Sequence, residues 1–187
     1  MWEVKVKLPA SVQEWLGEYT ARYDTSRLSR VRFYYTKNNE INGTCWYPEE
    51  KNYYPLFDGV ENTYRISVGL PRKYPYTVTL FCPPVYRKAD GSWPPVPPKC
   101  EVVKKKKVQQ KGKTVEWRRI ALDLSMPSLE VIAVYLFGHE FWHYLRETRQ
   151  APGRNTQTQA DMFGLAFLRM AQIEGAVPFT GPKGRKS

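Results

Sequence analysis

The sequence predicts an α+β fold with an N-terminal helix, an antiparallel or mixed sheet of four to five strands, and two C-terminal helices. Runs rich in aromatic and β-branched residues fill the first half of the chain, which indicates strands. Two later segments carry helix caps, one before an apolar run and one before an apolar stripe. With 187 residues, 42% of them hydrophobic, the chain is long enough to bury a core.

The first helix is predicted to run to about Tyr23, because Ser11 and Glu14 form a capping box and Pro9 lies just upstream. The strand signals that follow are separated by Asn, Gly and Pro clusters. The predicted strands are residues 30–37, 41–47, 63–70, 76–82 and 115–124. Asn38 and Asn39, between the first two strands, indicate a β-hairpin.

A long helix is predicted from an N-cap at Ser125, with Pro127 in its first turn, to about Arg149. Its stretch from Val131 to Phe137 is apolar on every side, which is typical of a buried helix.

The last helix is predicted to begin at a cap on Asn155 or Thr156 and to end near Gly175. Gly164 would let this helix approach its neighbour closely. Its apolar stripe consists of Ala160, Phe163, Phe167 and Ala171.

The most informative motif is His139-Glu140-Phe141-Trp142-His143, which contains both histidines of the chain. On a helix, residues four apart lie on one face, so the two imidazoles can bind a single Zn²⁺. Glu140 stands where a zinc peptidase carries its general base. The structural alternative is a pair of ordinary histidines on a half-buried helix.

A catalytic zinc site usually takes three protein ligands, so a third is expected from the last helix. Gln157 and Asp161 lie four apart there, on one face. A carboxylate binds Zn²⁺ far better than a neutral amide, which favours Asp161 as the ligand. The alternatives are that Asp161 orients one histidine and that Gln157 is a solvated helix residue.

The order of elements and the H-E-x-x-H helix resemble the minimal gluzincin metallopeptidases, which include SprT-like and ImmA/IrrE-like proteins. The resemblance implies a zincin-like fold, a Zn²⁺ cofactor, and a third ligand from the Glu of an E-x-x-A-D pattern. Residues 157–161 read QTQAD, so Ala160 and Asp161 match, whereas Gln157 replaces the ligand glutamate. Asp161 can take over coordination, as an Asp does in the aspzincin variant of the motif.

The expected function is therefore that of a zinc metallopeptidase, in which Glu140 takes a proton from a zinc-activated water that attacks the peptide bond. The extended substrate would lie along an edge strand, supplied by residues 63–70 or 76–82. One alternative is a catalytically inactive zincin-fold protein that binds nucleic acid or a protein partner through a basic insert. A further alternative is a zinc hydrolase that acts on something other than peptides.

That insert, at about residues 83–114, interrupts a single predicted domain of residues 1–175, and a flexible basic tail is expected at 176–187. The net charge of +11 indicates an anionic partner. The insert contains a Pro-rich segment and the run Lys104, Lys105, Lys106 and Lys107. The run is interpreted either as a grip on nucleic acid phosphates or as a solvated arm. Trp93 and Trp117 favour nucleic acid slightly, because aromatic rings stack on unpaired bases.

The cysteine pattern and the hydropathy predict a cytoplasmic protein without a membrane segment. Cys45, Cys82 and Cys100 are odd in number and lack C-x-x-C spacing, which is typical of reduced thiols. The N-terminus lacks the apolar core of a signal peptide. The longest apolar run is far too short to cross a bilayer.

Overall fold

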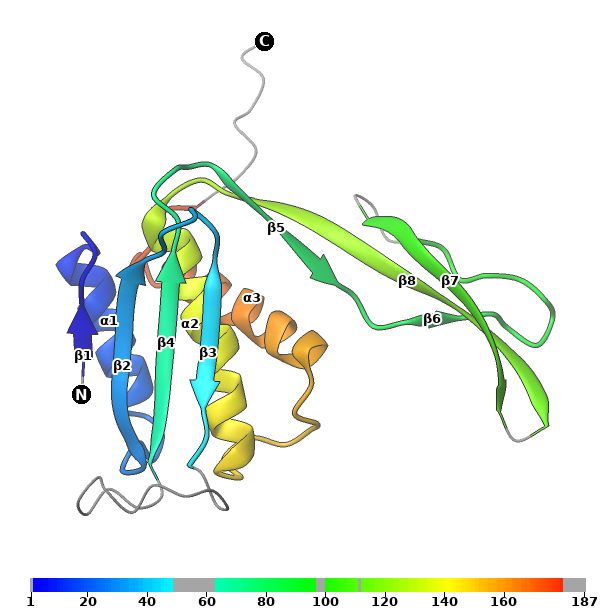
Figure 1. The fold of residues 1–187 in the computed structure, drawn as a ribbon, viewed down its shortest axis with the longest axis horizontal. Coiled ribbons are helices and arrows are strands. Elements are labelled where there is room, and N and C mark those ends of the chain that lie inside the picture. Colours follow the sequence, from blue (N-terminus) through cyan, green and yellow to red (C-terminus); the bar gives the residue numbers. More distant parts are fainter. Residues whose placement is uncertain (1, 49–62, 97–99, 111, 180–187) are drawn as a thin grey trace, which may run out of the picture. The chain divides into compact units, whose positions relative to one another are not determined.

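The structure is a computed structural model that describes residues 2–48, 63–96, 100–110 and 112–179. In these residues the chain forms a mixed α+β fold with three helices and two four-stranded sheets, which confirms the predicted class. It divides into two compact units (Figure 1). The first combines Met1–Tyr76 with Met126–Ser187, and the second is Thr77–Ser125.

The first unit carries one mixed sheet with the strand order β1-β2-β4-β3. Strands β1, β2 and β4 run parallel, and β3 pairs with β4 in the antiparallel sense. β3 is therefore an edge strand. The elements of this unit are β1 (Trp2–Val4), α1 (Ala10–Thr20), β2 (Leu28–Tyr35), β3 (Asn42–Trp46), β4 (Tyr64–Leu70), α2 (Leu129–Glu147) and α3 (Gln157–Ile173).

The predicted hairpin between β2 and β3 is wrong, because β4 lies between these two strands. Asn39 does form a turn, with a φ of 59°. Its side-chain Oδ1, however, accepts hydrogen bonds from the backbone N–H groups of Arg72 and Lys73, just after β4. These bonds hold the turn against the end of β4 and leave β3 at the edge. The expected edge strands are also wrong, since β4 is internal and residues 76–81 belong to the other sheet.

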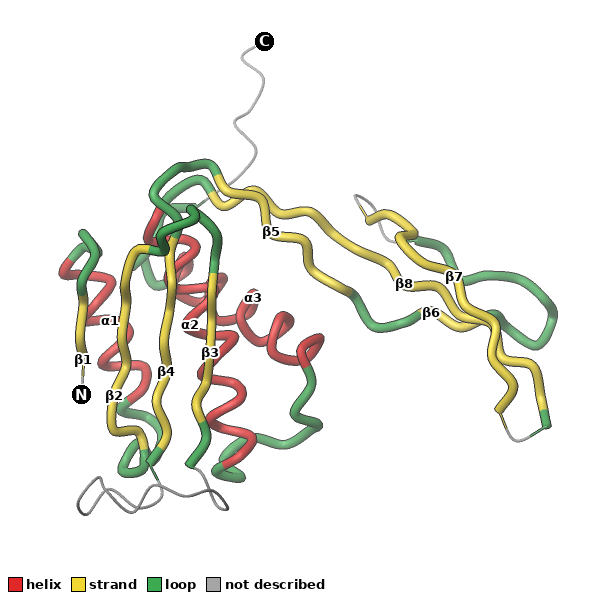
Figure 2. The backbone as a smooth tube through the Cα atoms, viewed as in Figure 1, coloured by secondary structure: helices red, strands yellow, loops and turns green. Residues whose placement is uncertain are grey.

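The core of the first unit lies between the sheet and the helices, which cover one face of the sheet (Figure 2). Phe33 of β2 stacks with Phe137 of α2 at 6.1 Å between ring centroids. The apolar run from Val131 to Phe137 is buried at every position, as predicted. α2 is thus the central helix, and whatever polar side chains it carries must find partners inside the protein.

The helix ends follow the sequence signals only in part. The Ser11 capping box is absent, because α1 begins two residues earlier than the box predicts, with Pro9 as N-cap and no side-chain cap. α2 begins at Leu129 with Ser128 as N-cap, since the preceding strand takes up Ser125. The caps of α3 agree with prediction: Thr156 accepts from the Gln159 N–H, and Gly175 follows the helix with a φ of 78°.

Gly164 allows α3 to lie directly against α2. A Cβ at this position would be 2.8 Å from the Tyr135 backbone oxygen, which cannot move without bending α2. We expect Gly164→Ala to lower the free energy of unfolding by about 1–3 kcal/mol, measured by urea denaturation. Gly17→Ala is the matched control, since a Cβ there meets nothing within 4 Å. That variant should be neutral or slightly stabilising. Equal stability of the two variants would contradict the proposed close packing.

The second unit is a sheet of the order β5-β8-β6, with β7 pairing with β8. It is wider than the insert expected at residues 83–114, because two strands predicted for the main sheet lie in it. Its strands are β5 (Tyr76–Phe81), β6 (Val85–Tyr86), β7 (Cys100–Gln110) and β8 (Lys113–Met126).

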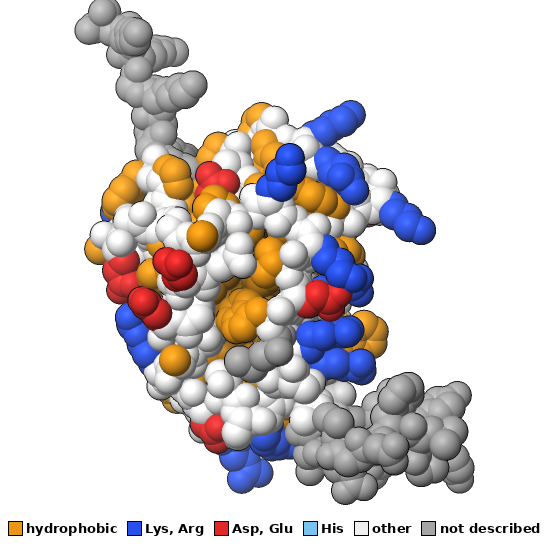
Figure 3. All heavy atoms as spheres, turned by 90° about the vertical axis from the view of Figure 1, so that its left-hand side faces the viewer, with side chains coloured by type: hydrophobic (Ala, Val, Ile, Leu, Met, Phe, Trp, Pro, Cys, Tyr) orange, Lys and Arg blue, Asp and Glu red, His pale blue; other side chains and the backbone are white. Residues whose placement is uncertain are grey.

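Basic side chains gather along one margin of the face drawn in Figure 3. Glu3 of β1 forms ion pairs with Lys5, just after this strand, and with Arg30 and Arg32 of β2.

The three cysteines are free thiols, as expected. Across the described residues, no helix combines the length and apolar character of a membrane span. Residues 180–187 of the predicted basic tail lie outside the described residues.

Candidate metal centre

His139 and His143 lie one turn apart on α2, and their ring centroids are 5.2 Å apart. Both side chains are buried: His139 is 8% exposed and His143 is 6% exposed. The structure therefore brings the two imidazoles together on one helix face, as the four-residue spacing predicts. Polar side chains meet both of them.

Asp161 of α3 faces the Nδ1 atom of His139, with its Oδ1 at a distance of 2.9 Å. This carboxylate favours the protonated ring and so acts to raise the pKa of His139. The Tyr135 hydroxyl donates a 2.9 Å hydrogen bond to the same carboxylate oxygen. Tyr135 thus holds Asp161 beside Nδ1 of His139. An oxygen partner on one ring nitrogen is the arrangement that orients a histidine whose other nitrogen binds a metal.

Gln157, at the start of α3, lies on the opposite side of the same ring. Its Oε1 is 2.9 Å from His139 Nε2, and its side chain also interacts with His143. Gln157 is therefore the residue whose side chain contacts both imidazoles, whereas Asp161 faces Nδ1 of His139.

Asn155 holds the second histidine and was not among the predicted site residues. Its Oδ1 is 2.5 Å from His143 Nδ1, and its Nδ2 donates to Glu147 at 2.6 Å and to the Tyr47 hydroxyl at 3.4 Å. Sequence reasoning considered Asn155 only as a helix cap. The contact of Asn155 with His143 depends on the path of the loop between α2 and α3. Residue spacing along the sequence does not predict that path.

Glu140 completes the cluster from the edge-strand side. Its Oε1 lies 3.9 Å from His139 Nε2, and the side chain is buried against Gly43 of β3. Burial raises the pKa of Glu140 to about 7, although His139 and a hydrogen bond with the Cys45 backbone act in the opposite direction. A carboxylate with this pKa can accept and release a proton near neutral pH.

The pKa values of the two histidines are shifted in opposite directions. Burial lowers the pKa of His139, but Asp161, Glu140 and Gln157 outweigh it, so the pKa is raised overall. Burial dominates at His143, and its pKa is lowered. In the orientation that the structure gives, the neighbours of His139 are all oxygen acceptors, whereas a neutral imidazole offers one N–H. A positive ion, either a proton or a metal, satisfies this arrangement.

These residues fit a divalent metal ion in their arrangement but not in their charge. Two imidazoles and an amide oxygen converge, and each histidine has an oxygen partner on Nδ1. The amide is neutral, so it binds a cation more weakly than a carboxylate. Within the described part of the chain, no group of three or more His, Cys, Asp or Glu side chains could hold a metal. His139, His143 and the expected ligand Asp161 therefore do not form such a group.

Gly43 is the backbone position that leaves room for Glu140. A Cβ added at Gly43 would overlap the Glu140 carboxylate and lie 3.0 Å from its Cδ. We expect Gly43→Ala to leave the fold intact, because the flexible carboxylate can move, but to displace Glu140, the general base that the motif predicts. If the protein hydrolyses peptides as the motif predicts, this displacement should slow hydrolysis by about 10- to 100-fold. The measurement is kcat/KM alongside zinc content; unchanged kcat/KM would show that Glu140 does not act from this position.

The remaining predicted site residues lie elsewhere. Lys104, Lys105, Lys106 and Lys107 are all on β7, in the second unit, and do not belong to this cluster. Searches against protein-family models, curated proteins and solved structures gave no match to this chain.

Proposed function

We propose that the first unit is a zincin-like metallopeptidase that hydrolyses peptide bonds, with Glu140 as the general base. The single observation that carries the proposal is the convergence at His139 Nε2. Gln157 Oε1 lies 2.9 Å from this nitrogen and Glu140 Oε1 lies 3.9 Å from it. Oxygen atoms beside an imidazole nitrogen are surroundings that favour a bound cation.

His139, His143 and Gln157 would hold the ion, and Asp161 and Asn155 would orient the two imidazoles. A bound zinc ion would supply a Lewis acid for the attacking water and the peptide carbonyl. Glu140 would take a proton from that water and pass it to the leaving amine. Burial favours this role, because it holds the pKa of Glu140 at about 7.

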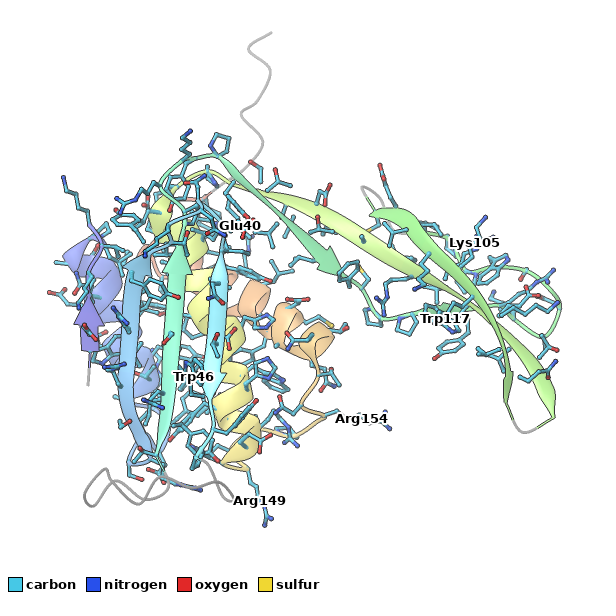
Figure 4. All side chains as sticks on the ribbon, in the orientation of Figure 1. Glu40, Trp46, Lys105, Trp117, Arg149 and Arg154 are labelled. Carbon is cyan, nitrogen blue, oxygen red and sulfur yellow. The ribbon has the colours of Figure 1, made fainter. Side chains whose placement is uncertain are left out.

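The edge strand supports a peptide as substrate. Among the described strands β3 pairs with β4 alone, and its Gly43 lies against Glu140. An extended chain can add to such an edge through backbone hydrogen bonds, which places a scissile bond beside the carboxylate. Trp46, at the end of β3, is 52% exposed (Figure 4). Such an exposed aromatic ring can pack against a substrate side chain.

The second candidate is a catalytically inactive protein on the same scaffold. The neutral amide of Gln157 favours it, because a weakly held metal would be lost at low zinc concentration. In that case the histidine cluster would be structural, and the activity of the protein would lie in its basic second unit.

The test is zinc binding and zinc-dependent cleavage by the full-length protein. After chelation and dialysis against Zn²⁺, wild type should bind one equivalent and cleave an unstructured protein such as casein. His139→Ala and His143→Ala should lose both properties, and no other histidine exists to replace them. Cys82→Ser and Cys100→Ser are the controls, since free thiols also bind zinc. One equivalent of zinc without cleavage, or no bound zinc, supports the inactive scaffold, and the absence of bound zinc contradicts the metallopeptidase.

A further inference from the structure

The lysine run on β7 is divided between two faces of the sheet. Residues directly opposite each other in an antiparallel pair project from the same face, and successive residues project from opposite faces. The pairs across β7 and β8 are Lys104 with Arg119, Lys105 with Arg118, Lys106 with Trp117, and Lys107 with Glu116. Lys105 and Trp117, labelled in Figure 4, therefore belong to opposite faces.

One face combines cations with aromatic rings. Tyr86 of β6 lies opposite Trp117, and so joins it on this face. The Arg119 guanidinium is 5.3 Å from the Phe81 ring and 5.9 Å from the Trp117 ring, and the Lys106 ammonium is 5.9 Å from Trp117. We call this set the aromatic–basic face: Lys104, Lys106, Arg119, Phe81, Tyr86 and Trp117.

On the opposite face, most cations have partners within the chain. Glu116 forms ion pairs with Arg87 at 3.0 Å and with Lys107 at 3.4 Å. The Arg118 guanidinium stacks on the Trp93 ring at 3.9 Å. We call Lys105, Lys107, Arg87, Arg118, Glu116 and Trp93 the paired face. Its cations Arg87, Lys107 and Arg118 have partners within the chain, whereas Lys105 forms no ion pair among the described residues.

The cations of the aromatic–basic face have no anionic partner among the described residues, although Lys106 and Arg119 lie near aromatic rings. Considering only described residues, Lys104, Lys106 and Arg119 form no ion pair, and all three are exposed. Asp123 lies further along the same face of β8 and accepts a hydrogen bond from Thr79. Two aromatic rings of the face are also exposed: Tyr86 is 54% exposed and Phe81 is 42% exposed. Exposed rings between unpaired cations indicate a ligand that carries both negative charge and flat apolar surfaces.

We propose that the aromatic–basic face binds single-stranded nucleic acid without sequence preference. Lys104, Lys106 and Arg119 would contact phosphates, and the rings beside them would stack on unpaired bases. A duplex hides its base faces, and an acidic peptide offers no such rings in regular succession, so neither uses both features of the surface. The inference goes beyond the peptidase proposal and does not depend on it.

The test compares two double variants of equal charge in the full-length protein. Lys104→Ala/Lys106→Ala removes two cations of the aromatic–basic face, and Lys105→Ala/Lys107→Ala removes two of the paired face. Affinity for a fluorescent oligothymidylate is measured by anisotropy over a range of salt concentrations. Three phosphate contacts predict a log–log salt slope of about −2 for wild type and about −0.7 for the first variant. The second variant should keep most of the wild-type slope.

The stacking component is tested by Tyr86→Ala, which removes an exposed ring and should not disturb the fold. Its expected effect is a loss of about fivefold or more in affinity for the oligothymidylate. Circular dichroism spectra establish that each variant is folded. Equal losses in the two double variants would overturn the proposal, because they would show diffuse attraction by net charge. So would unchanged binding in Tyr86→Ala, or tighter binding to duplex DNA or to anionic lipid vesicles than to the oligothymidylate.

Discussion

Glu140→Gln is expected to lower the rate of peptide hydrolysis by about 10²- to 10⁴-fold while leaving one zinc ion bound per chain. The carboxylate is buried near His139 Nε2, at 3.9 Å, and its raised pKa suits proton transfer near neutral pH. Glutamine has the same shape but cannot accept the proton. The measurements are kcat/KM with an unstructured protein substrate and zinc content by mass spectrometry.

The same substitution is expected to change the stability of the metal-free protein. This effect distinguishes a loss of the catalytic group from a loss of folded protein. Burial raises the pKa of Glu140 to about 7 in the metal-free protein, from an ordinary value of about 4.3 in an unfolded chain. The stability that its neutral form contributes is complete below pH 4.3 and is lost as the pH rises through 7. Metal-free Glu140→Gln should therefore melt at a higher temperature than wild type at pH 8, and the difference should shrink towards pH 5.

Glu147→Gln is the matched control for these measurements, because Glu147 lies on the same helix, is exposed and contacts Asn155. It should retain most of the activity. Retention of more than a tenth of the wild-type kcat/KM by Glu140→Gln would exclude Glu140 as the general base. Equal losses in both variants would point to damage to α2 instead.

Local patterns were sufficient to predict the two helices of the candidate site. The apolar run before His139 required a buried helix, the four-residue spacing put both imidazoles on one face, and Gly164 indicated a close helix contact. Each of these is a property of a single segment with a helical period. The corresponding structural features depend little on how distant strands pair.

The strand pairing and the partners of the histidines could not be predicted in this way. β4 pairs between β2 and β3 in the sheet, although it follows both of them in the sequence. This strand order depends on the parallel pairing of β4 with β2, which no local turn signal reveals. As a result, the sequence predicts Gly43 only as a strand residue, although it lies against Glu140. The choice between Gln157 and Asp161 depended on which ring nitrogen each one faces, and chemistry alone favoured the carboxylate.

Gln157→Glu is expected to raise the zinc affinity by about tenfold or more. Gln157 Oε1 lies 2.9 Å from His139 Nε2, so a carboxylate there would stand beside the cation. A unit charge pair about 4 Å apart is worth roughly 4 kcal/mol at the effective dielectric of a protein surface, before the cost of desolvation. That cost is small here, because Gln157 is exposed. Zinc affinity is measured by competition with a chelating dye.

Gln159→Glu is the matched control, since it adds the same charge on the same helix while its side chain faces the Arg154 backbone N–H. It should leave zinc affinity close to that of wild type. Zinc should also raise the melting temperature of Gln157→Glu more than that of wild type, because tighter binding to the folded state increases stability. If Gln157→Glu leaves the affinity unchanged and Asp161→Asn abolishes binding, then Asp161 is the third ligand. In that case the His139 ring must turn when the metal binds, because Asp161 now faces Nδ1 and not Nε2.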